Sequence, residues 1–126
     1  MKEQSRAVTI IAWILQILAA AAFLSAGTPK LMGNPMMVQM FDAIGVGQWF
    51  RYVTGGIEVG SAVLLLLPGR AIFGAILLIC TMIGAILTHL FVLHSPPTGP
   101  VGLLILVAII AWLRRDQLKV LGQANA

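Results

Sequence analysis

Long apolar segments, separated by short polar ones, make up most of the chain. A helix rises about 1.5 Å per residue, so about 20 apolar residues cross a hydrocarbon core of about 30 Å. The pattern predicts an all-α membrane protein with one domain over residues 1–126, built as a four-transmembrane-helix antiparallel bundle. The expected spans are residues 7–27, 52–67, 71–93 and 100–113. The last segment is short, and we expect the residues beside it to lengthen it.

The connection between the first two segments contains several signals for the ends of helices. Pro29 lacks a backbone donor and disfavours helical geometry at Thr28, so the first helix is expected to end or kink there. Asn34 followed by Pro35 predicts the start of another helix, and Gly45 predicts its end.

Apolar residues at helical spacing fill this stretch and predict a short interfacial helix over about residues 35–44. These residues are Met36, Met37, Met40, Phe41 and Ile44. We interpret them as a membrane anchor, with a lid over a ligand as the alternative.

Charged residues are rare and flank the apolar segments. They make up 10% of the chain, against about 25% in soluble domains, while 60% of the residues are hydrophobic. The basic residues behind the net charge of +4 are therefore interpreted as signals of membrane topology. The expected partner is the lipid bilayer, and no nucleic acid is expected to bind. A cleavable signal peptide is disfavoured for the first segment, because that segment is long and further spans follow.

The basic residues also predict the orientation. If the N-terminus lies inside, the inner side carries six of them and the outer side two, Lys30 and Arg51. The inner six are Lys2, Arg6, Arg70, Arg114, Arg115 and Lys119. The positive-inside rule therefore predicts that both termini are cytoplasmic.

The second segment carries a carboxylate, Glu58, inside its apolar run. A charge at this depth costs about 2.5–3.5 kcal/mol on insertion scales, so it usually has a partner or a function. Arg51 precedes it by seven residues, which places both on one helix face about 10 Å apart. Lys30 and His89 approach the same outer end from other helices. These four residues predict either a polar ligand pocket or a structural ion pair of Glu58 with Arg51 or Lys30.

Small residues predict close contacts between helices. Gly55, Gly56 and Gly60 lie on the second segment. On the third, Gly84 belongs to a stripe of small residues spaced four apart, with Cys80 before it and Thr88 after it. We expect these glycines to pack against neighbouring helices.

Several chemistries find no support in the sequence. Cys80 is the single cysteine, which excludes a paired-thiol relay. His89 and His94 are five residues apart and do not share a helix face, so no metal site is predicted. No phosphate loop, dinucleotide fingerprint or serine elbow is present, and no residue pattern assigns a catalytic group or a built-in cofactor.

The order and spacing of these residues resemble the DoxX-like family of small four-helix membrane proteins. The resemblance covers about residues 8–113 and is carried by three motifs. The motifs are Phe23…Ala26-Gly27-x-x-Lys30-Leu31, then Arg51-x-x-x-Gly55-x-x-Glu58-x-x-x-Ala62 up to Leu67-Pro68, and Gly74-Ala75 to Gly84-Ala85 ending near Thr88-His89. The resemblance implies that Lys30, Arg51 and Glu58 form the polar set of the family, with His89 as a further candidate.

The resemblance also implies where such a protein acts. Members include subunits of thiosulfate:quinone oxidoreductase and proteins linked to oxidative stress, whereas eukaryotic relatives are membrane chaperones. We expect a multi-pass protein of the bacterial inner membrane that binds a quinone or a lipid and assists a membrane redox or stress system. The expected partners are a soluble or membrane oxidoreductase subunit or a second copy of the chain. A non-enzymatic chaperone or scaffold and a small proton-coupled transporter are the alternatives.

Overall fold

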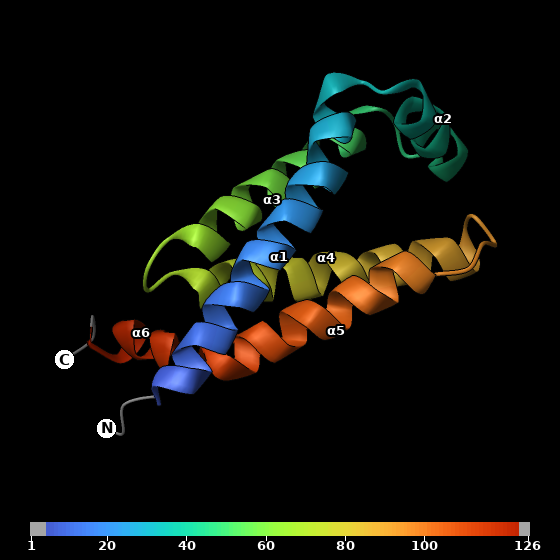
Figure 1. Cartoon of the computed structure of the whole chain (residues 1–126). Helices are drawn as coiled ribbons and strands as arrows, with labels where there is room; N and C mark the ends of the chain where they lie inside the picture. Colours follow the sequence, from blue (N-terminus) through green and yellow to red (C-terminus); the bar gives the residue numbers. More distant parts are fainter. Residues whose placement is uncertain (1–4, 124–126) are drawn as a thin grey trace.

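The structure, a computed structural model, describes residues 5–123, and every regular element within them is helical. Lys2, which the orientation argument uses, lies outside the described residues. The elements are α1 (Arg6–Met32), α2 (Pro35–Ile44), α3 (Trp49–Leu66), α4 (Ala71–Phe91), α5 (Thr98–Leu113), the 3₁₀ helix η1 (Arg115–Leu118) and α6 (Lys119–Gln123). The prediction of an all-helical chain is confirmed (Figure 1).

Length and composition identify two helices that suit a membrane crossing, α1 with 27 residues and α4 with 21. A third span is counted if α5 and the segment Arg115–Gly122, which meet at a bend of 65°, form one broken span. The helix α3 carries Arg51 and Glu58, and α5 has 16 residues. By length and composition the described helices therefore give two clear candidate spans, or up to three, and the predicted four-span bundle is not confirmed.

The end of α1 differs from the prediction. The helix continues through Pro29 to Met32, and Gly33, at φ 73°, ends it with a backbone N–H that donates to the Pro29 carbonyl. A left-handed residue at this position suits glycine, which has no Cβ to clash. We predicted that the helix ends or kinks at Pro29; it does not end there, because the Gly33 and Asn34 amides both donate to the Pro29 carbonyl and close a further turn.

The predicted bounds of α2 are confirmed. The Asn34 side chain accepts a hydrogen bond from the Met36 amide at 3.0 Å, Pro35 is the first helical residue, and Gly45 ends the helix at φ 85°. The helix lies across the ends of α1 and α3 rather than alongside them (Figure 1).

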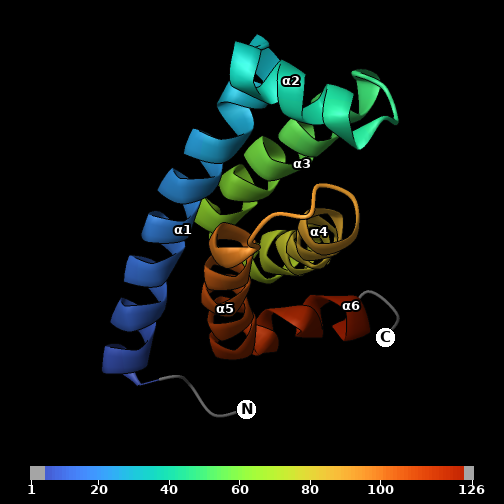
Figure 2. The ribbon, with the colours of Figure 1, turned by 90° about the vertical axis from the view of Figure 1, so that its right-hand side faces the viewer.

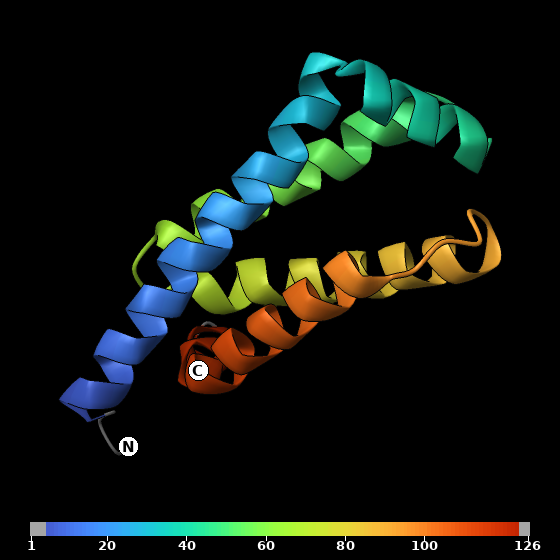
Figure 3. The same ribbon diagram turned by 45° about the vertical axis from the view of Figure 1, so that its right-hand side comes forward.

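The four long helices form two pairs that diverge from a common end. The helix α1 packs along α3, and α4 packs along α5, while α3 and α4 touch. Figure 2 and Figure 3 show that the two pairs separate toward the end that carries α2 and the connection between α4 and α5. The core of buried apolar side chains, which includes Phe23, Leu65 and Leu78, lies where the pairs meet.

Buried polar contacts hold the opposite end together. The Gln16 amide on α1 donates to the Leu65 carbonyl of α3 at 2.7 Å, and Arg114 donates to the Gln16 side-chain oxygen at 2.6 Å. Burial lowers the pKa of the Arg114 guanidinium from its ordinary value, and the Asp116 carboxylate opposes this effect. One glutamine thus links three helices where a membrane helix would otherwise leave polar groups unpaired.

Only part of the predicted glycine packing is present within the chain. A Cβ at Gly55 would lie 2.9 Å from the Lys30 Cβ and 3.0 Å from the Gly27 carbonyl oxygen, so α1 and α3 approach closely there. At Gly56, Gly60 and Gly84 a Cβ would meet nothing within 4 Å, so no neighbouring helix of the described chain packs closely against these three residues. Spacing alone does not reveal which side of the helix faces a neighbour.

Candidate functional site

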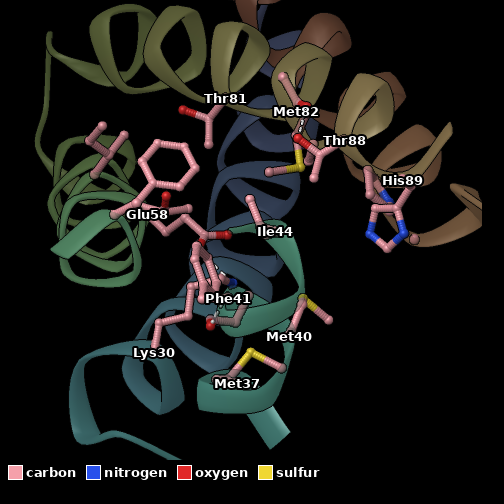
Figure 4. Close-up of a pocket in the computed structure, with 18 of the residues that line it drawn as sticks. Lys30, Met37, Met40, Phe41, Ile44, Glu58, Thr81, Met82, Thr88 and His89 are labelled. Atoms are coloured by element: carbon pink, nitrogen blue, oxygen red, sulfur yellow. Dashed lines mark hydrogen bonds and ion pairs between the residues drawn. The ribbon is translucent and has the colours of Figure 1, made fainter. Parts of the chain in front are cut away.

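A cavity of about 530 Å³ lies between the diverging helix pairs at the α2 end (Figure 4). Each of the helices α1 to α5 contributes residues to its lining, which is mostly apolar. The polar lining residues are Lys30, Thr54, Glu58, Cys80, Thr81, Thr88 and His89. Pockets of about 300–1,000 Å³ with a few polar groups in an apolar wall are the usual form of small-molecule sites.

Lys30 and Glu58 form an ion pair in this cavity. The Lys30 Nζ lies 2.8 Å from the Glu58 Oε1, and the two side chains are 14% and 3% exposed. Lys30 also donates to the Ala26 carbonyl of its own helix at 3.1 Å. Glu58 therefore does have a partner, and that partner is Lys30 rather than Arg51.

Two glycines allow this pair to form. The helices α1 and α3 approach closely at Gly27 and Gly55, where a Cβ on Gly27 would lie 3.0 Å from the Glu58 Cβ and from the Gly55 carbonyl oxygen. Lys30 follows Gly27 by three residues and Glu58 follows Gly55 by three. The glycine contact thus brings the two charged side chains into reach across the helix interface.

Arg51 is not part of the pocket lining. Its guanidinium donates to the Lys30 backbone carbonyl and to the Gln48 side-chain oxygen, the latter at 2.7 Å, and it lies over the Tyr52 ring. The Lys30 carbonyl belongs to the last turn of α1, where carbonyls lack partners within the helix. Arg51 therefore caps α1, which is a favourable place for a cation. The structure thus places Arg51 outside the cavity that Glu58 lines.

Gln48 is a connecting residue that the sequence did not reveal. Its amide nitrogen donates to the Val38 carbonyl at 2.9 Å and to the Asp42 carboxylate at 2.7 Å, both on α2. Its oxygen accepts from Arg51. Gln48 thereby attaches α2 to the start of α3, and no spacing rule would identify a single glutamine in a loop for this role.

His89 lies in the pocket wall but apart from the ion pair. Its Nδ1 is 2.7 Å from the Ser95 Oγ, which belongs to the connection after α4. Figure 4 shows His89 at one end of the pocket and the Lys30–Glu58 pair at the other. Of the four residues that we predicted to meet, the structure brings two together and places His89 in the same cavity.

The helix α2 forms a wall of the pocket. Met37, Met40, Phe41 and Ile44 line the cavity, whereas Met36 is 69% exposed. The apolar stripe of α2 thus faces the cavity as well as the surroundings of the protein. This arrangement favours the alternative interpretation of α2 as a cover for a ligand.

Long apolar helices and a mostly apolar pocket with a buried ion pair define a helical membrane protein. The chain belongs to the DoxX-like family, whose model matches residues 14–113. No curated protein and no solved structure matches the chain. Family membership agrees with the resemblance described above and supports a protein that resides in a membrane.

Proposed function

We propose that this DoxX-like protein binds a membrane amphiphile, a quinone or a lipid, in the cavity between its helix pairs. The observation that carries the proposal is the Lys30–Glu58 pair inside a mostly apolar cavity of about 530 Å³. An apolar wall suits a ring or an acyl chain, and a buried ion pair offers both a donor and an acceptor to a polar head group.

We place this binding in a membrane redox or stress system, as an accessory of an oxidoreductase subunit. The described residues contain no group of three side chains suited to a metal ion, and Cys80 is the single cysteine. In this proposal the chain offers a site for a carrier of electrons, and the partner supplies the redox centre. A second copy of the chain is the other proposed partner, and exposed Gly56 and Gly60 on α3 suit close contact with another helix.

A side chain that fills the cavity should abolish binding. Gly84 lines the pocket, and a Cβ there meets nothing within 4 Å, so Gly84→Phe is expected to fold and to occupy ligand space. The measurement is the rate at which N-ethylmaleimide alkylates Cys80, another lining residue, in detergent. The probes are a decyl quinone and its hydroquinone with fully alkylated rings, which leave no open ring position for thiol addition. At least one form is expected to slow alkylation several-fold in the wild type and to have no effect on Gly84→Phe.

The matched control is Gly60→Phe. Gly60 also has open space around it but does not line the pocket, so this variant should retain the protection. Equal loss of protection in both variants, or no protection in the wild type, would contradict the proposed site.

We also propose that α1, α3, α4 and α5 all cross the bacterial inner membrane, with both termini in the cytoplasm. The helix α3 has 18 residues and lies against both α1 and α4, which supports a crossing despite its two charges. The connection between α3 and α4, which contains Arg70, and the end of α5, which Arg114 and Arg115 follow, lie toward the same end of the molecule as the start of α1 (Figure 1), in agreement with the positive-inside rule.

The orientation predicts the behaviour of reporter fusions. Alkaline phosphatase is active only in the periplasm, so a fusion after Ala126 is expected to be inactive and a fusion within the residue 92–97 connection to be active. Activity of the fusion after Ala126 would contradict an even number of spans with a cytoplasmic N-terminus.

A further inference from the structure

We propose that the pocket selects uncharged amphiphiles whose head group carries a hydroxyl, and that Glu58 is the residue that selects them. This inference rests on the proposed function and specifies the class of ligand that the same cavity takes. For a quinone carrier, it means that the reduced, hydroxyl-bearing form binds in preference to the oxidised form.

The first step is the state of the Glu58 carboxylate. Its Oε1 is buried and lies 2.8 Å from the Lys30 Nζ, the usual distance of a charge-assisted contact between an ammonium and a carboxylate. No other group among residues 5–123 donates a hydrogen bond to this oxygen. A carboxylate accepts several hydrogen bonds, so the ion pair leaves further acceptor capacity on Glu58. A ligand O–H would supply a second donor to the carboxylate.

The second step is what Lys30 offers. An ammonium group has three N–H donors, and the structure directs one toward the Ala26 carbonyl. Lys30 can therefore donate to a ligand oxygen whether that oxygen belongs to a hydroxyl or to a ketone. Lys30 favours an oxygen without distinguishing the two, whereas Glu58 accepts from a hydroxyl and repels a ketone oxygen.

The third step is the charge of the cavity. Among lysine, arginine, aspartate and glutamate residues, the cavity lining contains Lys30 and Glu58, whose opposite charges cancel. The hydroxyl protons of Thr81 and Thr88 are not available to a ligand, because each hydroxyl donates to a carbonyl of its own helix, at 2.7 and 2.8 Å. An anionic phosphate would therefore find no excess of cations here, and its desolvation would be uncompensated. An uncharged head group fits better.

The hydroxyl could belong to a hydroquinone or to a hydroxyl-bearing lipid, and the experiment separates these sources. The probes are a decyl hydroquinone with a fully substituted ring, its quinone, its dimethyl ether and a monoacylglycerol of similar chain length. The assay is run under argon so that the hydroquinone is not oxidised. The measurement is the probe concentration that halves the alkylation rate of Cys80. A hydrogen bond to a charged acceptor corresponds to about tenfold or more in affinity.

We expect the hydroquinone to protect Cys80 at concentrations at least about tenfold lower than the quinone or the dimethyl ether. Protection by the monoacylglycerol at a similar concentration would identify the hydroxyl as sufficient, and its absence would add the ring as a requirement. In Glu58→Gln, whose amide also donates, the ratio between hydroquinone and quinone should fall to about threefold or less.

Equal protection by hydroquinone, quinone and ether in the wild type would overturn the selectivity while leaving the proposed binding intact. No protection by any probe would instead show that the proposed binding function is wrong. The comparison of probes uses the wild-type chain, so it does not depend on how well Glu58→Gln folds.

Discussion

Replacing Lys30 with methionine is expected to destabilise the protein by about 3–5 kcal/mol, because the change leaves a buried carboxylate without its partner. Glu58 is 3% exposed on its side chain, and the Lys30 ammonium is its counter-ion in the described structure. Methionine resembles the lysine stem in length, so packing against Gly55 is largely kept and the loss reports on the charge. The measurement is the thermal unfolding midpoint of the purified protein in detergent.

The double variant Lys30→Met/Glu58→Leu tests the origin of this loss. Removing both charges leaves an apolar contact, and such replacements are often neutral or stabilising, so the double variant should be more stable than Lys30→Met alone. Lys119→Met, at an exposed position in α6, should change stability by less than about 0.5 kcal/mol. If the double variant is as unstable as the single one, Lys30 acts through packing and the ion pair is not the cause.

The sequence predicts the helices well because their signals are local. Asn34, Pro35 and Gly45 give the bounds of α2, and the break predicted between the spans 52–67 and 71–93 separates α3 from α4, as the structure confirms. The depth of Glu58 in an apolar run also identifies a residue that needs a partner. Each of these predictions depends on a few neighbouring residues and on no tertiary contact.

The arrangement of the site could not be predicted in the same way. Arg51 and Glu58 share a helix face by spacing, yet the end of α1 lies beside Arg51 and accepts its hydrogen bond through the Lys30 carbonyl. The continuation of α1 past Pro29 creates this contact, because a helix ending at residue 27 would leave that carbonyl elsewhere. One local error in the end of a helix therefore changed the predicted partner of Arg51.

The glycines are a second example of a tertiary contact that the sequence does not predict. Gly55 and Gly56 are adjacent, and both were expected to pack, but they differ by about 100° of rotation around the helix axis. The structure turns Gly55 toward α1 and Gly56 toward open space. The sequence shows where small residues occur, and only the tertiary arrangement shows which of them permits the Lys30–Glu58 contact.

That difference leads to the second large expected effect. Gly55→Ala is expected to destabilise the protein by about 1–3 kcal/mol, because the new Cβ would lie 2.9 Å from the Lys30 Cβ and 3.0 Å from the Gly27 carbonyl oxygen. Relief requires α1 and α3 to move apart, which also separates Lys30 from Glu58. The measurements are the thermal unfolding midpoint and the protection of Cys80 by a pocket ligand, and both should fall.

Gly56→Ala is the matched control, since it makes the same chemical change one residue along the same helix. A Cβ there meets nothing within 4 Å, and alanine is a better helix former than glycine by about 1 kcal/mol, so stability should stay the same or rise. Opposite effects at adjacent residues would locate the α1–α3 contact at Gly55. If both variants behave alike, helix propensity explains the result and the close contact does not control the site.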